Sequence, residues 1–128
     1  MSLEEYFGDW LKVIDKKILY ETINILNTTD FSTLCPIYNN IFNCFTFCNL
    51  SNLKVVILGM SPYPQLNKAT GIAFGNKRET LDKDLSLSLQ VIKESVINYE
   101  IPQKNGIFDP SFEDWEKQGV LMLNCALT

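Results

Sequence analysis

The chain has 128 residues, of which 46% are hydrophobic and 20% are charged, and it carries a formal net charge of −4 with no histidine. A chain of this size predicts one soluble domain over residues 1–128, and no apolar run approaches the roughly 20 residues that cross a bilayer. The acidic balance excludes the broad positive field that drives non-specific DNA binding.

The amino terminus and the cysteines indicate the compartment. Residues 1–5 are acidic where a signal peptide would be basic, so we expect a cytoplasmic protein, or its nuclear or viral-host equivalent, and not a secreted one. Without histidine or a Cys-x-x-Cys pair, no metal site is expected, and no cofactor is implied. The cysteines are expected to be reduced thiols in the core: Cys35, Cys44, Cys48 and Cys125.

The first half of the chain predicts two helices. A capping box at Ser2 and apolar residues at helical spacing predict a first helix that runs to about Asp15. A second helix is predicted over residues 18–26 and ends at the polar stretch 27–30. An extended or short helical segment is expected over residues 35–45.

A buried strand is predicted next. The predicted strand covers residues 54–58, which after Lys54 are apolar and mostly β-branched, the pattern of a strand covered on both faces. The strand ends at Gly59, and the loop from there to about residue 83 should lie at the carboxyl end of the strand, where open α/β sheets bind ligands. Pro62 and Pro64 restrict the loop, so Tyr63 is expected to be held in one orientation.

The rest of the chain predicts a βαβ unit. A crossover helix over residues 85–99, capped by Asp82 or Asp84, is followed by turns over residues 101–110, a short helix over 111–117 and a second parallel strand over 120–123. The predicted class is therefore α/β. Two strands are too few for an independent sheet, so the chain is a fragment, which we favour, or a partner completes the sheet, or the open edge is covered in another way.

Three stretches resemble family 1 uracil-DNA glycosylases. Residues 55–75 (VVILGMSPYPQLNKATGIAFG) resemble the family's water-activating loop, Gly-Gln-Asp-Pro-Tyr-His followed by Gly-Leu-x-Phe. Residues 41–45 and 53–56 resemble its lead-in, and residues 115–128 resemble its second strand motif. The resemblance implies a partial three-layer sandwich with parallel central strands. It corresponds to the amino-terminal half, or slightly more, of a family member, so the domain is expected to be incomplete at its carboxyl end.

The resemblance also implies a pocket for a uracil that has swung out of DNA. Phe74 matches the ring that stacks on the base, Tyr63 the ring that crowds C5 and excludes thymine, and Asn124 the amide that reads the base edge. The main-chain N–H groups of Met60 and Ser61 match donors to O2. Structural alternatives stay open for each aromatic residue and for Asn124: a core ring, a tyrosine on the sheet edge and an asparagine that closes the strand.

Several family features are changed. Ser61 stands where the family has its water-activating aspartate, and a hydroxyl cannot offset the positive charge that develops in the transition state. Pro64 replaces a peripheral histidine, and residues 84–87 replace the phosphate-gripping prolines. The family's His-Pro-Ser loop would lie beyond Thr128.

We therefore expect a uracil-DNA-glycosylase-like protein of base-excision repair that recognises flipped-out uracil, with impaired hydrolysis of the N-glycosidic bond. Whether it is an enzyme stays open; the alternatives are an inactive base- or DNA-binding protein and a protein-interaction subunit that keeps only the fold. The expected partner is uracil-containing DNA, single- or double-stranded. Lys68, Lys77 and Arg78 form either a small phosphate-facing patch or, as we favour, scattered charge on a solvated loop.

Overall fold

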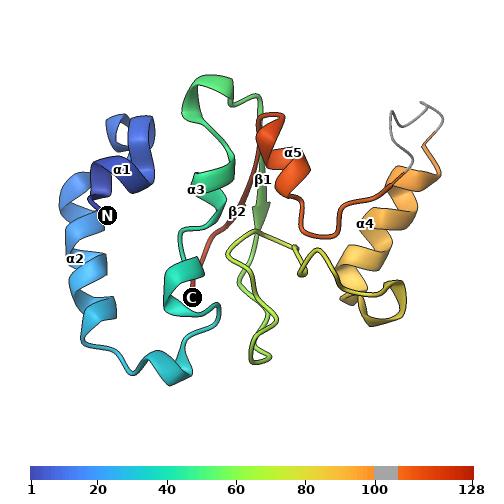
Figure 1. Cartoon of the computed structure of the whole chain (residues 1–128), viewed down its shortest axis with the longest axis horizontal. Coiled ribbons are helices and arrows are strands. Elements are labelled where there is room, and N and C mark those ends of the chain that lie inside the picture. The colour runs from blue at the N-terminus through green and yellow to red at the C-terminus, as the bar shows by residue number, and fades with distance from the viewer. Residues whose placement is uncertain (100–106) are drawn as a thin grey trace.

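The computed structural model describes residues 1–99 and 107–128 (Figure 1). Short helices dominate, several of them 3₁₀ helices, and the strands are brief. In chain order the elements are α1 (Leu3–Phe7), η1 (Gly8–Lys12), α2 (Lys16–Asn27), η2 (Phe31–Thr33), η3 (Tyr38–Asn40), α3 (Cys44–Phe47), η4 (Leu50–Asn52), β1 (Val55–Gly59), η5 (Asp82–Asp84), α4 (Leu87–Ile97), α5 (Glu113–Lys117) and β2 (Val120–Asn124).

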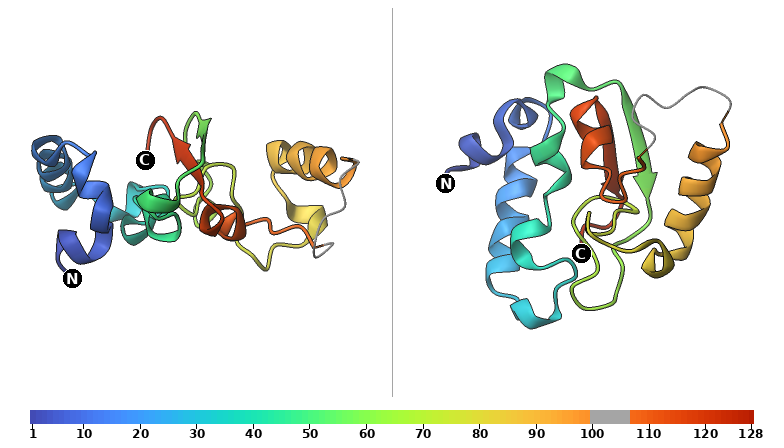
Figure 2. Two further views of the ribbon diagram at one scale, coloured as in Figure 1. Left: turned by 90° about the horizontal axis from the view of Figure 1, so that it is seen from above. Right: turned by 45° about the vertical axis from the view of Figure 1, so that its right-hand side comes forward.

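The two strands run parallel. Their register pairs Val55 with Val120 at one end and Gly59 with Asn124 at the other. Helices α1 to α3 lie on one side of the strands and α4 on the other, in both Figure 1 and Figure 2. The predicted α/β class with parallel central strands is therefore confirmed. Because Gly59 and Asn124 end their strands together, whatever follows β1 lies beside the end of β2.

The predicted first helix is interrupted. Its capping box is present: the Ser2 hydroxyl accepts from the Glu5 amide at 3.1 Å, and the Ser2 amide donates to the Glu5 carboxylate at 2.8 Å. The α-helix nevertheless ends at Gly8, whose φ of +51° lies in the left-handed region, and the chain continues as a 3₁₀ helix. This break still turns Trp10 into the core, where its indole N–H donates to the Cys48 carbonyl at 2.8 Å.

The second helix is confirmed as α2, and Asp15 caps it by accepting from the Ile18 amide at 3.1 Å. The segment between α2 and β1 contains four short helices, η2, η3, α3 and η4, and a cis peptide bond between Cys35 and Pro36. The four cysteines are free, as expected, but they are not all core residues. Cys44 and Cys48 are fully buried, whereas Cys35 is partly exposed and Cys125 is exposed.

Strand β1 is not covered on both faces, and this prediction is wrong. Val55, Val56 and Leu58 are 50%, 47% and 60% exposed. The reason is that β1 pairs only with β2 in the described part of the chain. An apolar sequence makes a strand suited to burial, but neighbouring elements decide whether the strand is in fact buried.

The crossover helix is α4, and it is shorter than predicted. Its first residue follows Ser86, so the predicted caps are wrong: Asp82 and Asp84 lie in η5 instead. Leu85 and Leu89 are buried in the main core, while Tyr99 lies beyond the helix and is exposed. The predicted turns at residues 101–106 lie outside the described residues.

The short helix α5 begins at Glu113, and it packs against β2 and α3. None of the helices in residues 1–99 and 107–128 is both long and apolar enough to cross a membrane.

Candidate functional site

A cavity of about 320 Å³ lies where the loop after Gly59 meets the end of β2. This volume is at the lower end of the range of about 300–1,000 Å³ for small-molecule sites, so the cavity suits a small ligand. All five residues that the sequence singled out line it. The lining comprises Met60, Ser61, Pro62, Tyr63, Pro64, Ala69, Thr70, Gly71, Ile72, Phe74, Ser88 and Asn124.

Gly59 makes room for the side chain of Asn124. The two residues pair in the strand register, and a Cβ placed on Gly59 would overlap Oδ1 of Asn124. The absence of a side chain at position 59 therefore lets the carboxamide lie across the end of the sheet. Within the described part of the chain the amide of Asn124 makes no hydrogen bond. Its donor and its acceptor are both free for a ligand, and its orientation is not fixed by neighbours.

Tyr63 and Phe74 are joined by a hydrogen bond. The Tyr63 hydroxyl donates to the Phe74 carbonyl at 2.9 Å. Phe74 has a φ of +62°, in the left-handed region that few residues other than glycine adopt. It is partly buried and packs against the main core while lining the cavity, so the core and ligand interpretations are compatible.

Met60 and Ser61 face the cavity mouth with main-chain groups available. The Met60 side chain is 82% exposed, so a ligand-binding contribution from this residue falls to its backbone. Its carbonyl accepts from the Ala126 amide at 3.0 Å, whereas the amides of Met60 and Ser61 donate no hydrogen bond among the described residues. Two adjacent free N–H groups are suited to an oxygen acceptor.

Two polar lining residues were not predicted from the sequence. Thr70 lies in the loop, and Ser88 lies in the first turn of α4. The signal that would have found Ser88 is positional: the helix that follows a strand-end loop starts near the edge of the sheet where the site lies.

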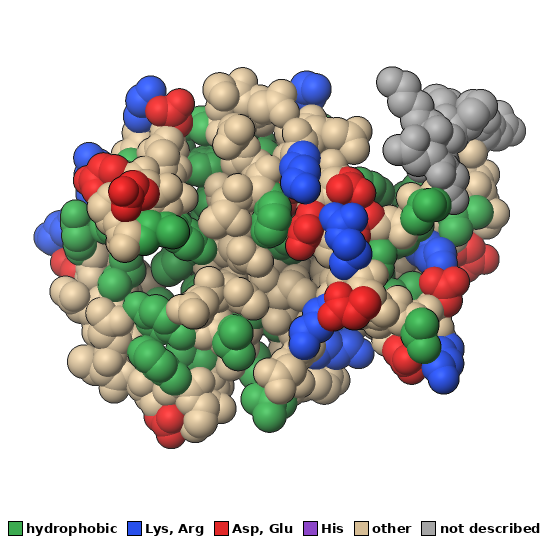
Figure 3. All heavy atoms as spheres, viewed as in Figure 1, with side chains coloured by type: hydrophobic (Ala, Val, Ile, Leu, Met, Phe, Trp, Pro, Cys, Tyr) green, Lys and Arg blue, Asp and Glu red, His purple; other side chains and the backbone are tan. Residues whose placement is uncertain are grey.

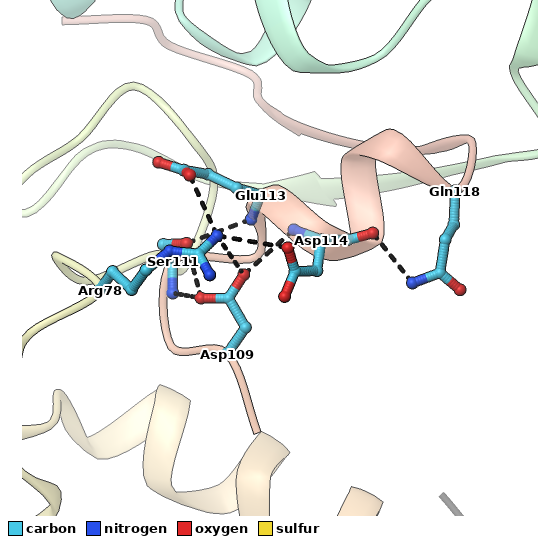
Figure 4. Close-up of polar contacts among 6 residues, drawn as sticks. All are labelled: Arg78, Asp109, Ser111, Glu113, Asp114 and Gln118. Carbon is cyan, nitrogen blue, oxygen red and sulfur yellow. Dashed lines mark hydrogen bonds and ion pairs between the residues drawn. The ribbon is translucent and has the colours of Figure 1, made fainter. Parts of the chain in front are cut away.

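Arg78, one of the three cations near the aromatic loop in the sequence, is engaged by acidic side chains. Arg78 is held by three carboxylates, at 3.3 Å from Asp109, 3.1 Å from Glu113 and 3.3 Å from Asp114 (Figure 4). The same cluster fixes the start of α5, because Asp109 also accepts from the Asp114 amide at 3.0 Å. Lys68 lies over the Tyr63 ring, with Nζ 5.7 Å from the ring centroid.

On the face shown in Figure 3, basic and acidic side chains are interspersed and no broad positive area is visible. Lys68 contacts Tyr63, an aromatic residue of the cavity lining, and is itself outside that lining.

No family model matches the chain. Curated relatives and solved structures, by contrast, share one family name. A uracil-DNA glycosylase of Lachnoclostridium phytofermentans is 38% identical over 129 residues, covering 94% of this chain and 54% of the relative. A uracil-DNA glycosylase of Dictyostelium discoideum is 31% identical over 137 residues, covering 99% of this chain and 38% of the relative. The chain thus spans about half, or less, of the length of these curated relatives.

Solved structures give the same result for the fold. A mimivirus uracil-DNA glycosylase superposes with a TM-score of 0.58 at 21% identity, over 99% of this chain and 53% of that one. A wild-type UNG from Nitratifractor salsuginis gives a TM-score of 0.55 at 19% identity, over 97% of this chain and 58% of that one. The predicted partial uracil-DNA-glycosylase-like α/β fold is confirmed.

Proposed function

Because this chain belongs to the uracil-DNA glycosylase family, which its curated relatives show, we propose that its cavity receives a uracil base swung out of DNA. The observation that carries the proposal is geometric. Met60, Ser61, Tyr63 and Phe74 come from the loop after β1 and Asn124 from the end of β2, and all of them line one cavity. A convergence of two aromatic rings with free polar groups in a small cavity suits a flat heterocycle.

The polar groups set the preferred base. Uracil offers an acceptor at O4 and a donor at N3, which the free carboxamide of Asn124 matches, and O2 can accept from the amides of Met60 and Ser61. Cytosine reverses the pattern at N3 and C4. The Asn124 amide favours uracil over cytosine only in the flip state that donates to O4 and accepts from N3–H, so the preference requires that state to be favoured when a base is bound.

The rings supply the remaining contacts. Phe74 stacks on the base plane, and Tyr63, stiffened by Pro62 and Pro64, lies against C5 and excludes the methyl group of thymine. Stacking of a base on an aromatic side chain contributes about 1–3 kcal/mol, so Phe74 carries much of the affinity.

Hydrolysis is impaired in this chain. Cleavage breaks the bond between N1 of uracil and C1′ of the sugar, with positive charge developing on the sugar and negative charge on the base; it ends with the hydroxyl of water on C1′ and its proton on the base. Ser61 brings a neutral hydroxyl where the family's carboxylate is expected, and the chain has no histidine to support the leaving base. We infer a protein that recognises damage in base-excision repair and hydrolyses it slowly or not at all.

Contact with DNA is local. With a net charge of −4 and Arg78 neutralised by its carboxylate partners, few cations remain beside the cavity. We therefore propose that uracil in single-stranded DNA binds better than uracil in a duplex, since no unpairing energy is spent and fewer phosphates must be held.

A protein-interaction role is favoured by a different observation. The apolar edge of β1 is exposed, so further polypeptide, as a continuation of this chain or as a separate partner, is proposed to complete the sheet beside Val56 and Leu58.

The binding proposal is tested by titrating isotope-labelled protein with free uracil and following backbone NMR shifts. We expect shifts confined to the cavity, centred on Phe74 and Asn124, and their loss in Phe74→Ala. Thymine and cytosine serve as matched ligands, and equal shifts with all three bases would contradict the assigned specificity. A protein that shows no cavity shifts at saturating uracil does not have the proposed function.

Hydrolysis is tested with a uracil-containing single-stranded oligonucleotide, followed by alkaline cleavage of abasic sites. We expect little or no product from the natural chain and more from Ser61→Asp, because the carboxylate restores orientation of the water and offsets the sugar charge. Ser61→Asn is the matched control without charge. Equal rates for all three proteins would show that position 61 does not have the assigned role.

A further inference from the structure

The backbone at Phe74 is held in a conformation that this residue does not favour. A φ of +62° brings the Cβ of an L-residue close to its own backbone and is disfavoured relative to the ordinary regions. Such a conformation persists only where the surroundings maintain it. Because the direction of the Phe74 ring follows from the backbone at this residue, whatever maintains φ also aims the ring into the cavity.

The residues on both sides of Phe74 are anchored. The Ala73 amide donates to the Met122 carbonyl of β2 at 3.0 Å, and the Gly75 amide donates to the Ile72 carbonyl at 3.0 Å. The Asn76 amide donates to the Pro110 carbonyl at 2.9 Å. The Gly75 N–H belongs to the peptide group that joins Phe74 to Gly75, so these bonds hold that group from its nitrogen side and leave its carbonyl oxygen, that of Phe74, for another partner.

That partner is Tyr63. Its hydroxyl donates to the Phe74 carbonyl at 2.9 Å, and among the described residues it is the only donor to that oxygen. Burial raises the pKa of the Tyr63 phenol. The hydroxyl therefore keeps its proton at neutral pH and remains a donor.

We propose that Tyr63 is a positioning residue for Phe74: its hydroxyl holds the Phe74 peptide in the left-handed conformation while its ring bounds the cavity. The two parts of one side chain then have separable tasks. The ring contributes exclusion of a methyl-bearing base, and the hydroxyl sets the plane on which any base stacks. The second task, in its effect on uracil, rests on the proposed function.

Tyr63→Phe separates these tasks, because it removes the hydroxyl and keeps the ring. In labelled protein we expect a weaker intraresidue amide-to-Hα NOE at Phe74, since that distance is shortest at positive φ and lengthens as ordinary conformations become populated. Uracil affinity should fall about five-fold, the change expected for the loss of one hydrogen bond. The ratio of uracil to thymine affinity should stay the same, because the ring remains.

Tyr38→Phe is the matched control. It removes another tyrosine hydroxyl, one that donates to Asn27 at 2.7 Å outside the cavity lining, and it should change neither the Phe74 signal nor the affinity. An unchanged Phe74 NOE in Tyr63→Phe would overturn the proposal, as would a selective change in the uracil-to-thymine ratio at constant uracil affinity. If the natural chain does not bind uracil, the proposed function fails, and the NOE measurement still decides the role of Tyr63.

Discussion

At the scale of single residues, a buried carboxyl group stands apart from the candidate site. Glu116 of α5 has no exposed surface; one of its oxygens accepts from the Met122 amide at 3.1 Å, and the other has no partner among the described residues. The pKa of Glu116 is raised to about 8, mainly by burial. The hydrogen bond from the Met122 amide lowers the pKa, and the negative charge of Glu113 raises it further. Glu116 is thus largely protonated at neutral pH in the folded protein.

This residue makes stability depend on pH. The ordinary pKa of the group is 4.5, so between about pH 4.5 and pH 8 the folded state holds a proton that the unfolded state has released. The free energy of unfolding therefore falls as pH rises through this window, by about 1.4 kcal/mol for each unit of pKa difference. Below about pH 4.5 the contribution of Glu116 to the free energy of unfolding is fully present. Above about pH 8 this contribution no longer changes with pH.

We expect Glu116→Gln to flatten this dependence, because an amide does not ionise. The measurement is urea unfolding at pH 5, 6.5 and 8, in the natural chain and in the variant. The exposed Glu94→Gln serves as a control and should keep the natural slope. If the free energy of unfolding varies with pH in the same way in the natural chain and in Glu116→Gln, Glu116 is not the source of the pH dependence.

At the scale of elements, the start of α4 is held by a buried asparagine in the loop that precedes the helix. The Asn76 amide group donates to the Ser86 hydroxyl at 2.9 Å, and the Ser86 backbone N–H donates to the Asn76 carboxamide at 3.0 Å. Both residues are buried. This pair docks α4 beside the aromatic loop and so positions Ser88, which lines the cavity.

We expect Asn76→Ala to destabilise the protein by about 2 kcal/mol, because it leaves the amide and hydroxyl of Ser86 without partners in a buried position. In a double-mutant cycle with Ser86→Ala, the two effects should fall short of additivity by about 1 kcal/mol, since each variant already removes part of the same contact. The measurement is denaturant unfolding of the four proteins. Strict additivity would show that the pair does not act as a unit.

At the scale of the whole molecule, the exposed apolar edge of β1 dominates. Val55, Val56 and Leu58 lie on a strand that pairs with β2 along one edge and, within the described residues, has no partner along the other, and such open edges pair with other chains. The curated relatives are about twice as long as this chain or longer. Whatever covers this edge, its exposure in the chain alone should promote self-association.

Val56→Lys is expected to increase the fraction of monomer, because a charged side chain on an edge strand opposes pairing with another edge. Sedimentation velocity over a range of protein concentrations measures this. Ile25→Lys, at an exposed position of α2, is the matched control and should leave the association unchanged. If Val56→Lys and Ile25→Lys self-associate equally, the chain does not self-associate through the edge of β1.

Local patterns determined part of this protein. The capping box at Ser2, helix α2 and the parallel pairing of β1 with β2 were all predictable, because caps, apolar periodicity and the strand–helix–strand order act over short stretches of chain. The loop after Gly59 could likewise be expected at the carboxyl ends of the strands. The assigned roles of its residues stay predictions.

The tertiary structure alone decided the rest. The exposure of β1 depends on whether another strand lies beside it, and the neutralisation of Arg78 depends on carboxylates more than 30 residues away in the chain. The bond from Tyr63 to Phe74 likewise needs the loop to fold back on itself. The physical reason is the same in each case: burial, charge pairing and hydrogen bonding are set by neighbours in space, which a one-dimensional pattern does not specify.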